Sequence, residues 1–151
     1  MSRSDALSWI DAEVEYSTDG SNWNSCSEDT LSVAVEGGER ATADTHTGDH
    51  TTPVVTFGPK GSLGVTVRGL YTSNGATDAV TEAQTAYDAD SDFYFRWFPE
   101  GKTVGKPMYT TEASKVLGPV VPVGEFSSAD AIAADIKLRT ATITQGTYST
   151  T

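Results

Sequence analysis

The chain has 151 residues, of which 21 are acidic and 10 are basic, so its formal net charge is −11 at pH 7 and its isoelectric point is near 4.4. A surface this negative repels phosphate, which excludes ordinary nucleic-acid binding by counterion release. Cys26 is the only cysteine, so an intramolecular disulfide is excluded. No apolar run approaches the roughly 20 residues that a membrane-spanning helix needs.

The first expected element is a strand over residues 9–16, where side chains alternate strictly between two faces. One face holds Ile10, Ala12, Val14 and Tyr16, and the other holds Trp9, Asp11, Glu13 and Glu15. This alternation is typical of a strand with one face on the core and one face in solvent. The Asp19-Gly20 pair that follows suits a tight hairpin turn.

A second strand is expected through Leu31, Val33 and Val35. Residues 37–52 then lack apolar periodicity, and we expect them to form a long loop. Connections longer than roughly 12–15 residues without structure of their own are uncommon unless they are functional or disordered, so this loop needs a role. Two further strands are expected at residues 53–57 and 63–67, separated by a turn at Gly58–Gly61.

The pattern changes to helical spacing between Asn74 and Tyr87, which predicts one amphipathic helix with Thr77 or Asn74 as its N-cap. An aromatic strand is expected at Phe93–Phe98, and another strand at Val120–Phe126. The last strand is expected at Ala134–Ile143. Its shared face consists of Ile136, Leu138, Thr140 and Thr142.

This order of elements predicts a single domain over residues 1–151 that is mostly β (α+β). A β-sandwich or a partly closed barrel with one flanking α-helix would bury the apolar faces. Residues 1–8 and 144–151, approximately, are expected to be flexible arms rather than core.

Two groups of residues are weighed as metal ligands. Asp88, Asp90 and Asp92 resemble the start of a calcium-binding loop, but Phe93 and Pro99 replace the glycine and the glutamate that such a loop requires. A hand-type calcium site is therefore excluded, and a solvated acidic loop is the preferred interpretation.

His46 and His50 are four residues apart, with carboxylates nearby, a spacing that suits zinc when both histidines lie on one helix. Gly48 and the surrounding threonines argue against a helix. We therefore expect a polar loop and no metal site.

No pattern in the sequence points to an enzyme. A Gly-x-Ser-x-Gly elbow is absent, and nothing links Cys26 to either histidine in a recognisable catalytic order. The glycines of Gly58–Gly64 do not precede a helix in the way that a phosphate-binding loop requires. We expect no catalytic residue and no cofactor, and we interpret the aromatic side chains of Phe93–Phe98 as core rather than as a stacking platform.

Five segments together resemble the tail tube proteins of long-tailed bacteriophages. They are Tyr16-Ser17-Thr18-Asp19-Gly20, Thr47-Gly48-Asp49-His50-Thr51-Thr52-Pro53-Val54, Arg68-Gly69-Leu70-Tyr71-Thr72, the helix from Thr77, and the strand Phe93–Phe98. Each segment alone is ordinary turn or strand chemistry. The resemblance therefore rests on their order along residues 9–143.

The resemblance implies a structural virion protein: a β-sandwich with a flanking helix, six copies closing into a ring, and rings stacking into a hollow tube that delivers DNA. The implied partners are other copies of the chain and other tail proteins such as the tape measure, tail terminator and distal tail proteins. DNA would pass only transiently and non-specifically, and no membrane insertion is implied. The protein would be made in the host cytoplasm and reside in the virion tail. A net charge of −11 suits a channel that DNA must cross without sticking.

Two sets of residues are candidates for roles in such a tube. Asp11, Glu13 and Glu15 are the candidates for an electronegative lumen, because they share the polar face of the first strand. The candidates for contacts between subunits lie in the long loop and are Arg40, Asp44, His46, Asp49 and His50. Two alternatives remain open: a virion decoration or receptor-binding module with an exposed aromatic strand, and an acidic β-rich hydrolase.

Overall fold

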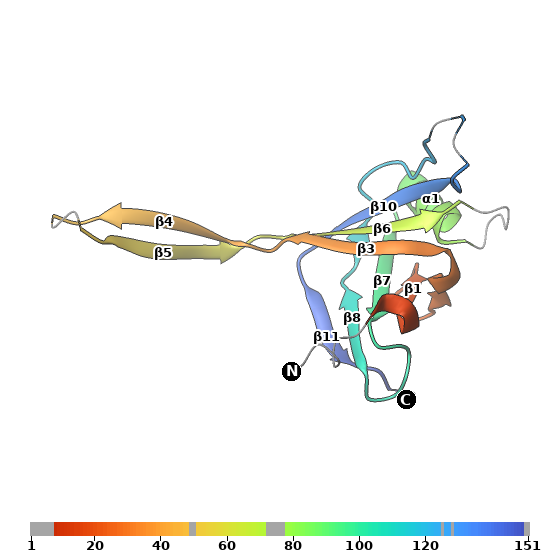
Figure 1. The fold of residues 1–151 in the computed structure, drawn as a ribbon, viewed down its shortest axis with the longest axis horizontal. Coiled ribbons are helices and arrows are strands. Elements are labelled where there is room, and N and C mark those ends of the chain that lie inside the picture. The colour runs from red at the N-terminus through yellow and green to blue at the C-terminus, as the bar shows by residue number, and fades with distance from the viewer. Residues whose placement is uncertain (1–7, 49–50, 72–77, 125, 128, 150–151) are drawn as a thin grey trace.

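Two β-sheets and one helix enclose the core, and a two-stranded hairpin projects from it (Figure 1). The computed structural model describes residues 8–48, 51–71, 78–124, 126–127 and 129–149. The chain is mostly β, as the sequence predicts, and the apolar faces of the two sheets pack against each other as a sandwich.

The first sheet contains the strands from both ends of the chain. Its order is β11-β8-β7-β1-β2, with β9 paired to β7 at the side. The bounds are β1 Glu13–Ser17, β2 Asn24–Ser25, β7 Asp92–Phe98, β8 Pro107–Thr111, β9 Ser114–Lys115 and β11 Ile143–Thr147. Its central pair is β1 with β7, which run antiparallel.

The second sheet has three antiparallel strands in the order β10-β6-β3. Their bounds are β3 Thr30–Gly37, β6 Leu63–Leu70 and β10 Ala133–Thr140. The expected strands around Leu31 to Val35, residues 63–67 and residues 134–140 are therefore confirmed.

The hairpin, here called the arm, consists of β4 (Arg40–His46) and β5 (Pro53–Lys60). It continues the β3–β6 pair outward, because β3 leads into β4 and β5 leads back into β6 (Figure 1). The two ladders meet at Gly37 and Gly38, which both adopt positive φ. The Gly38 N–H donates to the Ser62 carbonyl, and the Gly61 N–H donates to the Glu39 carbonyl, both at 3.0 Å.

The helix α1 (Ala79–Ala89) lies across the side of the sandwich and buries its alanine face. It begins at Asp78, whose carboxylate accepts a hydrogen bond from the Thr81 N–H at 2.7 Å. The expected caps Thr77 and Asn74 are therefore wrong, and both lie outside the described residues. Asp78 is preferred because its carboxylate also interacts favourably with the positive end of the helix dipole.

The core combines both sheets and the helix. The aromatic face of β7 supplies Phe93, Phe95 and Trp97, which confirms that these rings are used for packing. Tyr16 stacks on Phe93 at 5.7 Å between ring centroids. The opposite sheet contributes Val65, Val67, Ile136 and Leu138. Interdigitated aliphatic and aromatic side chains of this kind dominate the stability of a β-sandwich.

Several expected boundaries are wrong. The first strand begins at Glu13, since residues 9–11 form a 3-10 turn, η2 (Trp9–Asp11). The loop expected at 37–52 is wrong for residues 40–46, which form β4, and β5 runs through the turn expected at Gly58–Gly61 as far as Lys60. The sequence did not indicate β4 or the end of β5, because neither strand of the arm has a buried face and neither therefore alternates regularly between apolar and polar residues.

Two further expectations near the C-terminus are wrong. The strand expected at Val120–Phe126 is reduced, within described residues 120–124, to a single bridge between Val123 and Ala133. The C-terminal arm expected from residue 144 is instead β11, which pairs with β8 from Ile143 to Thr147. Thr142 was expected to share a face with Ile136, but it does not, because the chain turns there between β10 and β11.

The glycine junction at the base of the arm gives a test of stability. A Cβ added at Gly37 would lie 2.6 Å from the Ser62 carbonyl oxygen, and φ there is +83°. We expect Gly37→Ala to cost about 1–2 kcal/mol, the penalty of a left-handed alanine, and to lower Tm by about 2–8 °C in a thermal melt. Gly48→Ala is the control, since a Cβ there meets no atom within 4 Å. Equal melting of the two variants would contradict this account.

Candidate assembly surfaces

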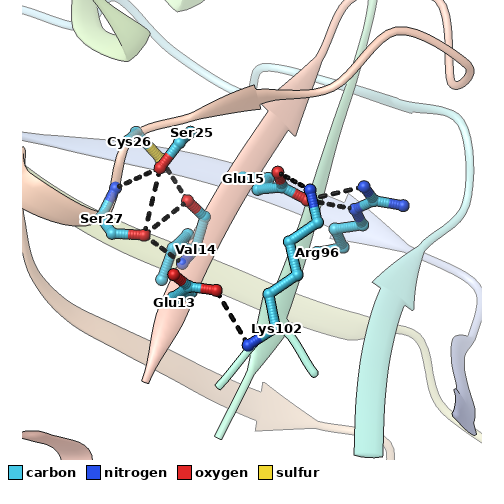
Figure 2. Close-up of polar contacts among 8 residues, drawn as sticks. All are labelled: Glu13, Val14, Glu15, Ser25, Cys26, Ser27, Arg96 and Lys102. Atoms are coloured by element: carbon cyan, nitrogen blue, oxygen red, sulfur yellow. Dashed lines mark hydrogen bonds and ion pairs between the residues drawn. The ribbon is translucent and has the colours of Figure 1, made fainter. Parts of the chain in front are cut away.

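A buried carboxylate is the centre of the polar face of the first sheet (Figure 2). Glu15 is only 4% exposed, although it points away from the core. Its cross-strand partner on β7 is Arg96, whose Nη2 lies 2.6 Å and whose Nε lies 2.7 Å from Glu15 Oε1. Charge-assisted hydrogen bonds of this length are among the stronger polar contacts in proteins.

A second cation completes this cluster. Lys102, on the connection between β7 and β8, places Nζ 2.9 Å from Glu15 Oε2, and its backbone N–H donates to Glu13 Oε2 at 2.8 Å. Arg96 also stacks over the Trp23 ring at 4.3 Å from the centroid. Thus two cations neutralise Glu15 inside its own chain, and one of them, Arg96, also lies against aromatic rings.

This cluster changes the interpretation of the lumen candidates. The two faces of the strand are as predicted, because Val14 and Tyr16 are buried in the core opposite Glu13 and Glu15. The three carboxylates do not form one row on a strand, because Asp11 lies on η2, Glu13 is half-buried, and Glu15 is ion-paired and buried. Arg96 and Lys102 could not be recognised as partners of Glu15 from the sequence, since they lie 81 and 87 residues away. Whether Asp11 or Glu13 faces a lumen stays a prediction.

Cys26 has a structural position under β1. Its N–H donates to the Val14 carbonyl at 2.9 Å, and its side chain is buried. Burial raises the pKa of the Cys26 thiol to about 11. The thiol is therefore protonated at neutral pH, and a protonated buried thiol is a poor nucleophile.

The arm is exposed on both faces. Thr42, Asp44 and His46 alternate onto one face of the arm, and their cross-strand partners are Phe57, Val55 and Pro53. Arg40 pairs with Lys60 at the base of the arm, and the register shifts between Arg40 and Thr42. Phe57 is 69% exposed, and Val55 beside it is also exposed. Of the predicted contact residues, Asp44 and His46 thus lie on one face of the arm and Arg40 lies at its base, whereas Asp49 and His50 lie outside the described residues.

Two of the hollows on the body of the molecule, away from the arm, are lined by polar and apolar side chains together. One, here called the η2 groove, has a volume of about 350 Å³ and is lined by Trp9, Ile10, Leu31, Val33 and neighbouring residues. The other, about 570 Å³, lies beside Phe126, Val123, Ile132 and Arg68. Both expose large apolar side chains. Exposed apolar patches of this kind are typical of protein–protein contacts.

The remaining candidates for chemistry are placed in ordinary structural roles. Asp90 ends α1 in the left-handed conformation, and Asp92 forms an ion pair with Lys115 at 3.2 Å. Among the described residues, no three His, Cys, Asp or Glu side chains gather as a metal site. The receptor-binding alternative requires an exposed aromatic strand. That expectation is wrong for Phe93, Phe95 and Trp97, because all three side chains are buried. None of the described helices has the length and apolarity needed to cross a membrane.

The Glu15 cluster predicts a specific loss of stability. Glu15→Gln leaves Arg96 and Lys102 without their anion, and breaking a buried pair costs 3–5 kcal/mol. Because the Lys102 side chain is 32% exposed, we expect about 2 kcal/mol, or about 4–8 °C in Tm. Asp135→Asn is the matched control, since it removes only the surface pair with Arg68 at 3.1 Å and should shift Tm by less than about 2 °C. Equal shifts would show that the cluster contributes no more than a surface pair.

No protein-family model matches the sequence, and no curated protein matches it. Solved structures do match. The SPP1 tail tube is 12% identical with a TM-score of 0.68, covering 96% of this chain and 82% of that one. A protein of the cap that terminates the anti-feeding prophage tube is 12% identical with a TM-score of 0.66, covering 97% and 95%.

A third match comes from the tail of an empty gene transfer agent particle, which has C6 symmetry. It is 10% identical with a TM-score of 0.65, and it covers 95% of this chain and all of the matched one. Likeness over nearly the full length of several chains, at identities this low, is likeness of fold. The chain therefore has the fold of the tail tube proteins.

Proposed function

We propose that this chain is a structural subunit that self-assembles into hexameric rings, and that the rings stack into a hollow tail tube through which DNA is delivered. The observation that carries the proposal is the tail-tube fold along nearly the whole chain, with matches in a tail tube, a tube cap and a C6-symmetric tail. No catalytic step is part of this role.

The arm supports self-assembly on physical grounds. A two-stranded hairpin alone in water is marginally stable at best. This arm exposes Phe57 and Val55 and has no layer packed on either face within the described residues. A neighbouring copy that covers the arm would remove this apolar surface from water and stabilise the hairpin. The predicted contact residues Arg40, Asp44 and His46 are suitably placed for such a role.

The proposal includes a location and partners. The protein would reside in the virion tail and contact other tail proteins such as the tape measure, tail terminator and distal tail proteins. Asp11 and Glu13 remain our candidates for the lumen, where a negative wall would repel DNA at short range. Glu15 is not retained, because Arg96 and Lys102 neutralise it.

Electron microscopy of concentrated protein tests the proposal directly. We expect negative-stain images to show filaments whose end views average to sixfold rings around a central pore. The same images should also be taken with fragments of assembled tube added as seeds, which removes any barrier to nucleation. Class averages with another closed symmetry, or monomers alone in seeded samples, would overturn the proposal and favour a decoration or receptor-binding module.

Removing the arm should separate folding from assembly. The Glu39 carbonyl accepts a hydrogen bond from the Gly61 N–H at 3.0 Å, so residues 40–60 can be replaced by an Asn-Gly turn without moving the body. We expect the body to melt as the parent does, because shortening a long connection has a small thermodynamic effect. Filaments should be absent. Normal filaments from this variant would exclude the arm from assembly.

A further inference from the structure

The η2 groove and the arm lie at opposite ends of one continuous ladder. The groove is beside Thr30–Val33 at the start of β3, and the arm begins beyond Gly37 at its end. The arm then runs a further ~20 Å away, at ~3.3 Å per residue over Arg40–His46. Figure 1 shows the arm extending away from the body that holds η2 and the first residues of β3. An arm therefore cannot reach the groove of its own chain.

The groove has one unpaired strand edge beside it. Among the described residues β3 pairs only with β6, which leaves its other edge open. Edges of this length usually carry a lysine, a proline or a covering segment that prevents association. β3 has the sequence TLSVAVEG, with neither lysine nor proline; its one charge, Glu36, lies at the end away from the groove, and its register shifts between Thr30 and Ser32. The exposed Ile10, at 87%, and the exposed Trp9 and Leu31 lie next to it.

The charges around the two surfaces are complementary. The turn η3 (Ser27–Asp29) borders the groove and carries Glu28 and Asp29, neither of which forms an ion pair among the described residues. The arm places Arg40 directly opposite Lys60, also without an ion pair. Two cations side by side repel each other, so an acidic partner relieves that repulsion. The larger hollow near Phe126 is a poorer match, because it is lined by a single carboxylate, Asp130, together with Arg68.

We propose that the η2 groove receives the arm of a second copy, with Phe57 and Val55 against Trp9, Ile10 and Leu31, and with Arg40 and Lys60 facing Glu28 and Asp29. The inference rests on the proposed self-assembly and names the two surfaces that meet. Because they are different surfaces at opposite ends of the chain, the contact is head-to-tail. Head-to-tail contacts repeat from copy to copy and generate rings or filaments rather than closed dimers.

Charge reversal on each side, followed by mixing, tests the pairing. The arm-reversed protein carries Arg40→Glu and Lys60→Glu, and the rim-reversed protein carries Glu28→Lys and Asp29→Lys. Each alone presents like charges at every contact, so we expect no filaments from either, whereas circular dichroism melts should match the parent. A 1:1 mixture places opposite charges at every contact again, and we expect filaments that contain both proteins in equal amounts.

A second mixture controls for net charge. Lys137→Glu with Arg139→Glu makes the same charge change as the arm reversal, but on the outer face of β10. The rim-reversed protein, carrying a tag, should sediment in equal amount with the arm-reversed protein. With this control it should sediment only in trace amounts, because its intact arm can cap a filament end but its reversed rim repels the arm of the next copy.

The outcomes separate the two proposals. Filaments from the parent protein, together with filaments from either reversed protein alone or none from their mixture, would overturn the pairing and leave the proposed function standing. Absence of filaments from the parent protein, with seeds supplied, would overturn the proposed function itself.

Discussion

The backbone pairing between residues 30–37 and 63–70, continued by residues 40–46 and 53–60, is the constraint on which the rest of the structure depends. One long antiparallel ladder serves two environments. Its inner part presents Val65 and Val67 to the core and holds the second sheet against the first. Its outer part has strand geometry without a core. Gly37 and Gly38 mark the change, because their positive φ allows the ladder to break and restart while the register of both parts is kept.

Most of the strands that could be predicted from the sequence bury one face in the core. Strands with one buried face, such as β6, β7 and β10, are expected from the sequence, since alternation of apolar and polar residues reports half-burial. β4 was missed because Arg40–His46 has no buried face to report. β8 was missed as well: four of its five residues, all but Thr111, are only half-buried, and pairing with β7 and β11 fixes it rather than an apolar face.

The candidate site residues show the same division between properties that are local in the sequence and properties that depend on distant residues. The alternation correctly separated Glu13 and Glu15 from Val14 and Tyr16, because that separation is a local property of a strand. It could not show that Arg96 and Lys102 neutralise Glu15, which depends on pairing between distant parts of the chain. The net charge of −11 is thus a poor guide to any one position: an acidic residue on a polar face is here a buried structural anion. A residue whose role depends on contact with another copy of the chain is harder still to identify from one sequence.

The first sheet joins strands from both ends of the chain, and this pairing affects the order in which the elements fold. The arm and the β3–β6 ladder form one hairpin, whose contacts are local and close quickly, whereas β1 must find β7 across 81 residues at Glu15 and Arg96. Pairings of such large separation form late, because the entropy of closing the loop is lost before the contact stabilises it. Residues 9–14, which wall the η2 groove, depend on β1 for their position. If the proposed pairing holds, a partly folded chain would display an arm before it possesses a groove, and it would add to the end of a growing assembly without yet offering a site to the next copy.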